Sequence, residues 1–273
     1  MDYDYIIVGS GFGGSVSALR LSEKGYKVLV IEKGKWYKGK DFAKTNWDFK
    51  RWLWVPFLKC FGIMKLTITR HIMILSGVGV GGGSLVYANT LPVPKKTFFN
   101  SGSWAGLRDW EEELKPHYET ALRMLGAKQN PVLFDGDKAL LDVAKELGIE
   151  SKFAPTKVGV YFGKPNVTVP DPYFDGEGPE RTGCNFCGAC MTGCPNNSKN
   201  TLDKNYLFLA QKRGAKILAE KEVIDVNPLG NKSGKDGYSV SFRDSTKLFK
   251  RTRVLKTRAV IYSGGVLGTL KLL

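Results

Sequence analysis

Apolar and polar positions near the N-terminus predict a strand, a helix and a second strand in succession. Residues 5–8 form a short, β-branched apolar run that is typical of a buried parallel strand. The alanine- and leucine-containing segment 15–24 predicts a helix, which Gly25 would terminate. Residues 27–31 predict the second buried strand. This order of elements is typical of a nucleotide-binding α/β unit.

Farther along the chain, apolar positions spaced by three and four residues predict amphipathic helices at 110–125 and 137–147. Pro116 is expected to break or kink the first of them. A third helix is expected at 203–213. Residues 153–180 are rich in proline, glycine and aspartate and predict loops. Four further strands are expected at 215–218, 223–226, 238–242 and 259–262, with a hairpin turn at 235–237.

The first predicted strand leads into a glycine-rich turn, Gly9-Ser10-Gly11-Phe12-Gly13-Gly14, which matches the G-x-G-x-x-G motif. Gly9 permits the tight turn, Gly11 lets the backbone approach a pyrophosphate, and Gly14 lets helix and strand pack closely. The helix N-terminus favours the negative charge of the pyrophosphate. Glu32, at the end of the second strand, can accept hydrogen bonds from a ribose and would disfavour a 2′-phosphate. The motif predicts a dinucleotide site without separating FAD from NAD.

A second glycine-rich stretch covers residues 75–91 and contains Gly79, Gly81, Gly82 and Gly83. So many glycines cannot form a stable helix or an ordinary strand. They suit a loop whose main chain lies against a ligand and supplies N–H donors. The alternative is a glycine-rich bend that close packing requires.

Three segments of the sequence resemble the glucose-methanol-choline (GMC) oxidoreductases, particularly their cholesterol-oxidase-like branch. They are GSGFGG followed by VLVIEKG, then GVGVGGGSLVYANTLP, and AVIYSGGVLGTLKLL at the end, so the resemblance spans nearly the whole chain. It implies FAD rather than NAD as the cofactor. It also implies oxidation of the CH–OH group of an alcohol by hydride transfer to the flavin N5.

By the same resemblance, the second glycine loop and Ser84 would approach the pyrophosphate and isoalloxazine, and Val223 would meet the adenine through its backbone. Relatives often carry an Asn near the flavin where this chain has Tyr87 or Ala88, and Asn89 is the nearby substitute. Leu270 stands where many relatives carry proline or a small residue. The cofactor-binding residues expected from motif and resemblance are Gly9, Gly11, Gly13, Gly14, Glu32, Gly79, Gly81, Gly82, Gly83, Ser84, Asn89, Val223 and Gly264.

The expected fold is α/β: a Rossmann-like FAD-binding domain with a parallel sheet and helices, plus part of an α+β substrate domain. Residues 1–95 and 200–273 are expected to form a discontinuous and incomplete FAD-binding domain. Residues 96–199 would form an inserted region of helices and loops that begins the substrate domain.

No catalytic residue is expected in this chain. Removing a hydroxyl proton calls for a base, usually histidine, and only His71 and His117 are present. The resemblance places the catalytic histidine far beyond residue 273. His117 is expected on a partly exposed helix, and His71 is expected to be structural. Because the chain ends within an apparent helix, GVLGTLKLL, we expect a fragment of a longer protein.

Four of the five cysteines lie in one run, Cys184, Cys187, Cys190 and Cys194, followed by Pro195. The spacing C-x2-C-x2-C-x3-C-P is that of bacterial ferredoxins, and it predicts an iron–sulfur cluster. The fourth cysteine of such a run often serves a second cluster, so a variant cluster or another ligand would be required. Zinc and cysteines that hold no metal remain open. A cluster would favour an alternative function, an electron-transfer flavoprotein that serves a partner.

Charge and hydropathy bear on partners and compartment. The chain has 273 residues with 41 Lys and Arg against 26 Asp and Glu, a net charge of +15 that favours anionic partners. It lacks a recognised nucleic-acid motif, so no nucleic-acid partner is expected. The N-terminus lacks a signal peptide, so a cytoplasmic location is expected. The expected partner is a small alcohol, sterol-like or otherwise apolar, and the electron acceptor is left open.

The aromatic stretch 50–65 is flanked by lysine and arginine, and Pro56 and charged residues interrupt it, so it is not a transmembrane helix. It can line a pocket for an apolar substrate or contact a membrane interface peripherally. The alternative is a buried cap over the flavin domain.

Overall fold

The computed structural model describes residues 1–45, 47–231 and 233–273. Its centre is a six-stranded mixed sheet with the order β11-β2-β1-β14-β13-β12. The first four are parallel neighbours, and β13 is antiparallel to both β14 and β12. The predicted α/β class with a parallel-containing sheet is confirmed. The strands are β1 (Tyr3–Val8), β2 (Val28–Ile31), β11 (Lys216–Leu218), β12 (Lys221–Pro228), β13 (Tyr238–Asp244) and β14 (Thr252–Tyr262).

Strand β1 lies at the centre of the parallel part and has both faces buried. Its residue Ile7 packs into the apolar cluster on one face, while Ile6 and Val8 pack into the cluster on the other. This division follows from the two-residue period of a strand. A continuous apolar run is therefore what this position requires, as the sequence predicted.

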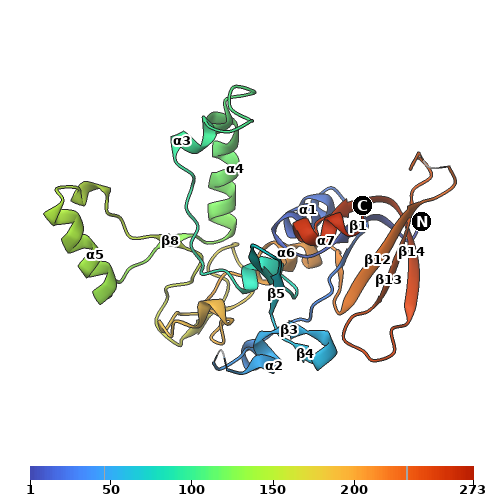
Figure 1. Cartoon of the computed structure of the whole chain (residues 1–273), viewed down its shortest axis with the longest axis horizontal. Coiled ribbons are helices and arrows are strands. Elements are labelled where there is room, and N and C mark those ends of the chain that lie inside the picture. The colour runs from blue at the N-terminus through green and yellow to red at the C-terminus, as the bar shows by residue number, and fades with distance from the viewer. Residues whose placement is uncertain (46, 232) are drawn as a thin grey trace.

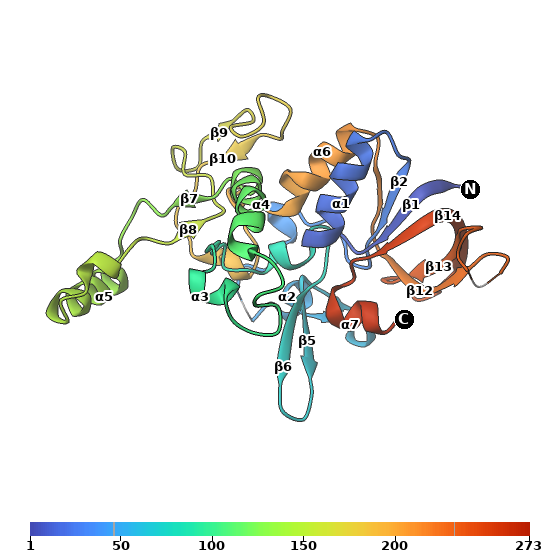
Figure 2. The same cartoon turned by 90° about the horizontal axis from the view of Figure 1, so that it is seen from above.

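Two helices, α1 (Phe12–Glu23) and α6 (Tyr206–Lys212), cover one face of the sheet and lie side by side in Figure 2. Leu19 of α1 and Leu207 of α6 are almost completely buried in the same cluster. Burying each leucine contributes about 2 kcal/mol of hydrophobic free energy. On the other face, Val240 and Phe242 of β13 pack against β1 and β2.

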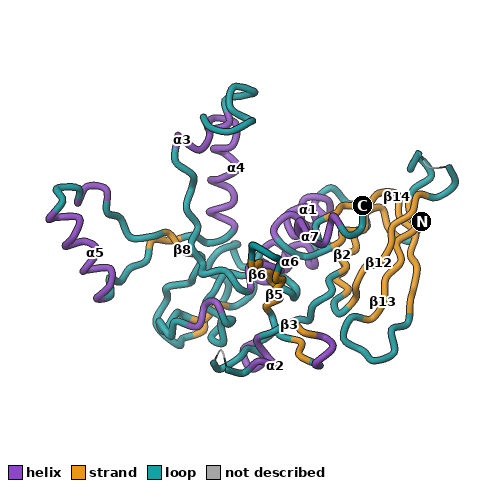
Figure 3. Tube along the Cα trace, in the orientation of Figure 1, coloured by secondary structure: helices purple, strands orange, loops and turns teal. Residues whose placement is uncertain are grey.

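Most of the remaining elements have six residues or fewer and are joined by loops, which Figure 3 shows in teal. Helix α5 lies at the far end of the molecule from the sheet in both Figure 1 and Figure 2. The helices are α2 (Phe49–Trp52), α3 (Lys96–Phe99), α4 (Trp110–Met124), α5 (Asp135–Glu146) and α7 (Gly265–Leu270). The strands are β3 (Trp54–Val55), β4 (Cys60–Phe61), β5 (Met64–Ile68), β6 (Met73–Gly77), β7 (Lys128–Gln129), β8 (Lys157–Val158), β9 (Thr168–Val169) and β10 (Arg181–Thr182).

Two expectations about local structure need correction. Helix α4 continues through Pro116, so the expected break is absent, while the expected kink stays a prediction. Pro116 is exposed, so water can satisfy the carbonyl that loses its intrahelical donor. The helix expected at 203–213 is divided into a 3₁₀ turn at Leu202–Lys204 and α6, because Asn205 has a non-helical backbone and caps α6 through its side chain.

The aromatic stretch 50–65 is divided between interior and surface. Trp54, Ile63 and Met64 are buried. Phe57 and Leu58 are 84% and 60% exposed, so the stretch is only partly a buried cap. Among the described helices, none combines the length and the apolar content that crossing a bilayer requires.

The three glycine-rich segments of the sequence meet at the carboxyl end of β1, where their backbones touch. A Cβ added at Gly9 would lie 2.5 Å from the carbonyl oxygen of Ser263, at the end of β14. A Cβ at Gly82 would lie 2.7 Å from the Cα of Gly11. At Gly14 it would collide with the carbonyl oxygen of Gly9. Glycine is required here because backbone packs directly on backbone.

We therefore expect Gly14→Ala to destabilise the fold by about 1–3 kcal/mol, because helix and strand would have to move apart. Gly11→Ala is the matched control, since a Cβ there meets no described atom within 4 Å and φ is −69°. Urea unfolding followed by circular dichroism measures both. Equal unfolding midpoints for the two variants would contradict the packing role of Gly14.

Candidate functional site

The centre of the candidate site is Ser10, a fully buried residue that joins the first glycine turn to the second glycine loop. Its hydroxyl donates to Glu32 Oε2 at 2.8 Å and to the carbonyl oxygen of Gly79 at 3.3 Å. The same hydroxyl accepts a hydrogen bond from the backbone N–H of Gly81 at 3.1 Å. Ser10 thus positions both glycine segments relative to the end of β2.

Glu32 is buried and already accepts hydrogen bonds from the protein. Its Oε2 also accepts from the backbone N–H of Ser10 at 3.0 Å, and its Oε1 accepts from that of Gly34 at 2.9 Å. A carboxylate has about four acceptor positions, so it can still bind a ribose hydroxyl. The ribose contact stays a prediction, and the observed role of Glu32 is to hold the turn in shape.

The motif glycines divide into two groups by what surrounds them. Gly9, Gly14 and Gly82 face protein backbone at a distance that excludes any side chain. At Gly11 and Gly83, by contrast, an added Cβ meets at most one side-chain atom, 3.9 Å away, so both glycines face open space. They lie beside the N-terminus of α1, where backbone N–H groups lack intrahelical partners. The open space at Gly11 and Gly83 leaves room for an anionic diphosphate beside these N–H groups.

Hydrogen bonds of Ser84 hold the second glycine loop against the buried segment around Leu202, which follows the cysteines. Ser84 is fully buried, donates to the carbonyl oxygen of Gly81 at 2.7 Å and accepts from the backbone N–H of Leu202 at 3.0 Å. Gly81 itself adopts φ of +107°, which favours glycine. These contacts hold the loop in one conformation.

Lys199 makes the strongest connection to this loop. Its side chain is fully buried, and its Nζ donates to the carbonyl oxygens of Leu85, Tyr87 and Cys190 at 2.9, 2.7 and 2.8 Å. The ammonium also lies 4.7 Å from the centre of the Tyr87 ring. Lys199 therefore fastens the second glycine loop to the segment that carries the cysteines.

Burial shifts several pKa values in this region. It lowers the pKa of Lys199 to about 7, because the charged ammonium is removed from water, and nearby Cys190 and Cys194 oppose this shift only in part. Burial also raises the pKa of the Tyr87 hydroxyl, with nearby Cys190 adding to the rise. The Tyr87 hydroxyl therefore stays protonated, and the side chain is uncharged.

Two of the other predicted residues, Val223 and Gly264, adjoin strands of the sheet, while Asn89 lies in the second glycine-rich stretch. Val223 is buried at the start of β12, where the N–H of Lys221 donates to the Glu32 carbonyl oxygen. Gly264 precedes α7 next to Ser263, whose N–H donates to Val8. Asn89 is buried, with φ of +65° and its carbonyl oxygen accepting from Gly159 at 2.9 Å.

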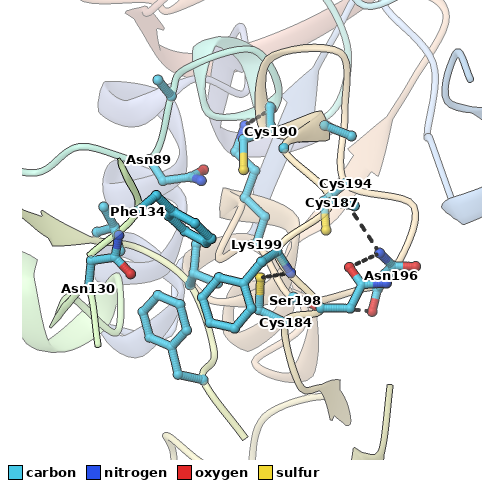
Figure 4. Close-up of a pocket in the computed structure, with 18 residues that line it drawn as sticks. Asn89, Asn130, Phe134, Cys184, Cys187, Cys190, Cys194, Asn196, Ser198 and Lys199 are labelled. Atoms are coloured by element: carbon cyan, nitrogen blue, oxygen red, sulfur yellow. Dashed lines mark hydrogen bonds between the residues drawn. The ribbon is translucent and has the colours of Figure 1, made fainter. Parts of the chain in front are cut away.

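The structure does not assemble the cysteine run into the predicted iron–sulfur site. Among the described residues, no three His, Cys, Asp or Glu side chains are close enough together to hold a metal ion. Cys184 Sγ accepts from the N–H of Phe186, and Cys187 Sγ accepts from Asn196 Nδ2. Positive φ angles at Phe186, Gly188 and Gly193 turn the backbone between the thiols. The four cysteines, Cys184, Cys187, Cys190 and Cys194, are free and line a cavity (Figure 4).

The two histidines are exposed. His71 lies in the turn between β5 and β6, so the expectation of a structural His71 finds no support in its burial. His117 lies on α4, as expected. We assign neither of them a role in the site.

Sequence reasoning missed Ser10 and Lys199. The role of Ser10 could have been inferred from its position inside the glycine motif. A buried serine needs hydrogen-bond partners, and Glu32 was already expected nearby. Lys199 gave no signal, since its partners are backbone oxygens more than a hundred residues away in sequence for two of the three bonds.

Comparison with known proteins supports the resemblance. Residues 179–273 match the family model described as GMC oxidoreductase, and residues 7–36 match that of an NAD(P)-binding Rossmann-like domain. A cholesterol oxidase of Acinetobacter baumannii is 49% identical over 281 residues, covering 100% of this chain and 50% of that protein. A cholesterol oxidase of Mycobacterium tuberculosis is 54% identical over 222 residues, covering 80% of this chain and 38% of that protein.

The fold is also found among solved structures. An FAD-dependent oxidoreductase from Chaetomium thermophilum, in complex with a small fragment, superposes with a TM-score of 0.58 at 19% identity, covering 100% of this chain and 47% of that one. At this identity the likeness concerns the fold alone. The chain spans about half the length of the Acinetobacter relative.

We expect Lys199→Met to destabilise the fold by about 3 kcal/mol or more, because three carbonyl oxygens would lose their shared donor. The control is Lys164→Met, since Lys164 is exposed. Urea unfolding measures both variants. If Lys199→Met lowered the free energy of unfolding no more than Lys164→Met does, Lys199 would not hold the loop in place.

Proposed function

Since this chain belongs to the GMC oxidoreductase family, in its cholesterol-oxidase-like branch, we propose that it is the FAD-binding part of an alcohol-oxidising flavoenzyme. The observation that carries the proposal is the open space at Gly11 and Gly83, beside the N-terminus of α1. An FAD diphosphate is suited to this space, because the first turn of a helix offers unpaired backbone donors.

The residues of this chain would bind and orient the cofactor. The first turn of α1 would hold the diphosphate, Glu32 would accept the adenosine ribose, and Val223 would face the adenine. The loop from Gly81 to Asn89 would lie along the flavin, and Ser84 and Lys199 keep that loop in place. FAD, when bound, supplies a hydride acceptor for the alcohol carbon.

The proposed substrate is an apolar alcohol of the sterol type. Two relatives at 49% and 54% identity are named cholesterol oxidase, which supports this class. The base that removes the hydroxyl proton is assigned to neither His71 nor His117, since both are exposed. The alternative of an electron-transfer flavoprotein depends on the cysteine run, and no three of the described His, Cys, Asp or Glu side chains are arranged to hold a metal ion.

We expect the chain to bind FAD and to quench its fluorescence, with ADP competing because it occupies part of the same site. NADP⁺ should compete poorly, because Glu32 repels a 2′-phosphate. Gly11→Ala should weaken FAD binding about tenfold or more by filling this open space, while its unfolding midpoint stays near that of the parent.

Fluorescence titration measures these affinities. NADP⁺ binding tighter than FAD binding would contradict the choice of flavin. Unchanged FAD affinity in Gly11→Ala would show that the diphosphate lies elsewhere.

The substrate class requires its own measurement. The chain is co-expressed with the part of the Acinetobacter relative that follows the matched region. We expect the two pieces to form a yellow flavoprotein. Its colour should bleach when an apolar alcohol is added in the absence of oxygen, because the flavin is then reduced. The alkane of equal length is the control. Bleaching by neither compound in a flavin-loaded complex would contradict alcohol oxidation.

A further inference from the structure

The loop of residues 245–251 joins β13 to β14 and presents two adjacent apolar side chains to solvent. Leu248 is 84% exposed and Phe249 is 87% exposed. Single apolar residues scattered over a surface are ordinary, whereas two neighbours at the tip of one loop form a patch that water solvates poorly. This tip is the feature from which the inference starts.

The base of the loop is held by hydrogen bonds, so the fold itself directs the tip outward. The Ser245 hydroxyl donates to the carbonyl oxygen of Lys33 at 2.5 Å, and the Ser245 N–H donates to that of Glu220 at 3.1 Å. The Thr246 hydroxyl donates to Glu220 Oε1 at 3.2 Å. In Figure 1 the loop extends below both strands, on the side of the molecule opposite α5.

The segment around this tip is strongly basic. Residues 245–258 contain six Lys or Arg side chains and neither Asp nor Glu. All six basic side chains are exposed; they are Lys247, Lys250, Arg251, Arg253, Lys256 and Arg258. Such a concentration of one sign of charge attracts a surface that carries many negative charges.

The protein neutralises only part of this charge. Lys247 lies 3.8 Å from Asp244, and Arg258 lies 3.3 Å from Asp4. Asp244 is paired more closely with Lys221, at 2.5 Å. The other four basic side chains of residues 245–258 pair with no carboxylate among the residues that the structure describes. Their charge is therefore available to a partner.

The order of residues at the tip favours a lipid surface over other polyanions. Leu248 and Phe249 stand between Lys247 on one side and Lys250 and Arg251 on the other. At an anionic bilayer the apolar pair can enter the acyl region while the flanking cations bind phosphate and carboxylate groups of the headgroups. A nucleic-acid backbone would accept the cations but offers no apolar medium to the pair.

We propose that the loop between β13 and β14 docks this protein on an anionic lipid surface, with Leu248 and Phe249 among the acyl chains and the flanking basic residues on the headgroups. The docking is independent of the proposed function, because it uses no residue of the glycine turns and requires no flavin. The loop is also a different segment from residues 50–65, at which the sequence favoured a peripheral contact.

Sedimentation with vesicles tests the docking. The purified chain is mixed with vesicles of phosphatidylcholine alone or of phosphatidylcholine with phosphatidylserine, and the bound fraction at each lipid concentration gives a Kd. We expect binding to phosphatidylcholine alone to be weaker about tenfold or more, because the attraction between opposite charges is then lost. Added salt should weaken binding to the phosphatidylserine vesicles, since it screens the exposed charges.

The apolar tip is tested by a double substitution. Leu248→Ser with Phe249→Ser should weaken binding to the phosphatidylserine vesicles about tenfold or more, because the tip no longer gains by leaving water. The matched control is Leu140→Ser with Val143→Ser on α5, where the side chains are 61% and 49% exposed. This control should bind like the parent chain.

The basic residues are tested in the same way. Lys250→Gln with Arg251→Gln should weaken binding about tenfold or more, because two cations leave the headgroup layer. Lys115→Gln with Lys152→Gln removes the same charge from exposed positions elsewhere and should have little effect. Equal losses in the two charge variants would overturn the role of the loop and leave attraction by the net charge of +15 alone.

Three further outcomes would overturn the docking. They are equal binding to both kinds of vesicle, unchanged binding after Leu248→Ser with Phe249→Ser, and tighter binding to a DNA duplex that the serine substitutions do not affect. FAD binding, read by fluorescence quenching, should be the same in every variant. A chain that binds the vesicles but not FAD would therefore count against the proposed function alone.

Discussion

Direct backbone-to-backbone packing at the carboxyl end of β1 is the constraint on which the rest of this structure depends. Gly9, Gly14 and Gly82 lie where a Cβ would strike another main chain, so segments far apart in sequence can touch. This contact places the open glycines Gly11 and Gly83 near one another. The same residue type thus has two physical tasks here, to pack closely and to leave room for a ligand.

Buried polar groups connect this glycine centre to the remainder of the chain. Ser10 joins Glu32 to the second glycine loop, and Lys199 joins that loop to the cysteine loop. Each is fully buried, so each hydrogen bond acts in a medium from which water is excluded. Lys199 thus lines the cavity and also holds the second glycine loop.

The cysteine run illustrates how spacing alone can mislead. Its spacing matches that of ferredoxins, yet a cluster requires that the sulfur atoms converge, and convergence depends on the turns between them. The backbone at Phe186, Gly188 and Gly193 takes positive φ, and the thiols end up around an apolar cavity. What the loop presents to the cavity is four free thiols.

Sequence by itself determined the α/β unit, the strands β1 and β2, the helix α1 and the glycine turn, because period and turn chemistry are local. Only the tertiary structure decided that Ser10 and Lys199 matter, since their partners are distant in sequence or belong to the main chain. The break expected at Pro116 is absent from α4, because local propensity cannot tell that this part of the helix is exposed to water. Long-range contacts follow from the fold, and residue patterns alone do not contain them.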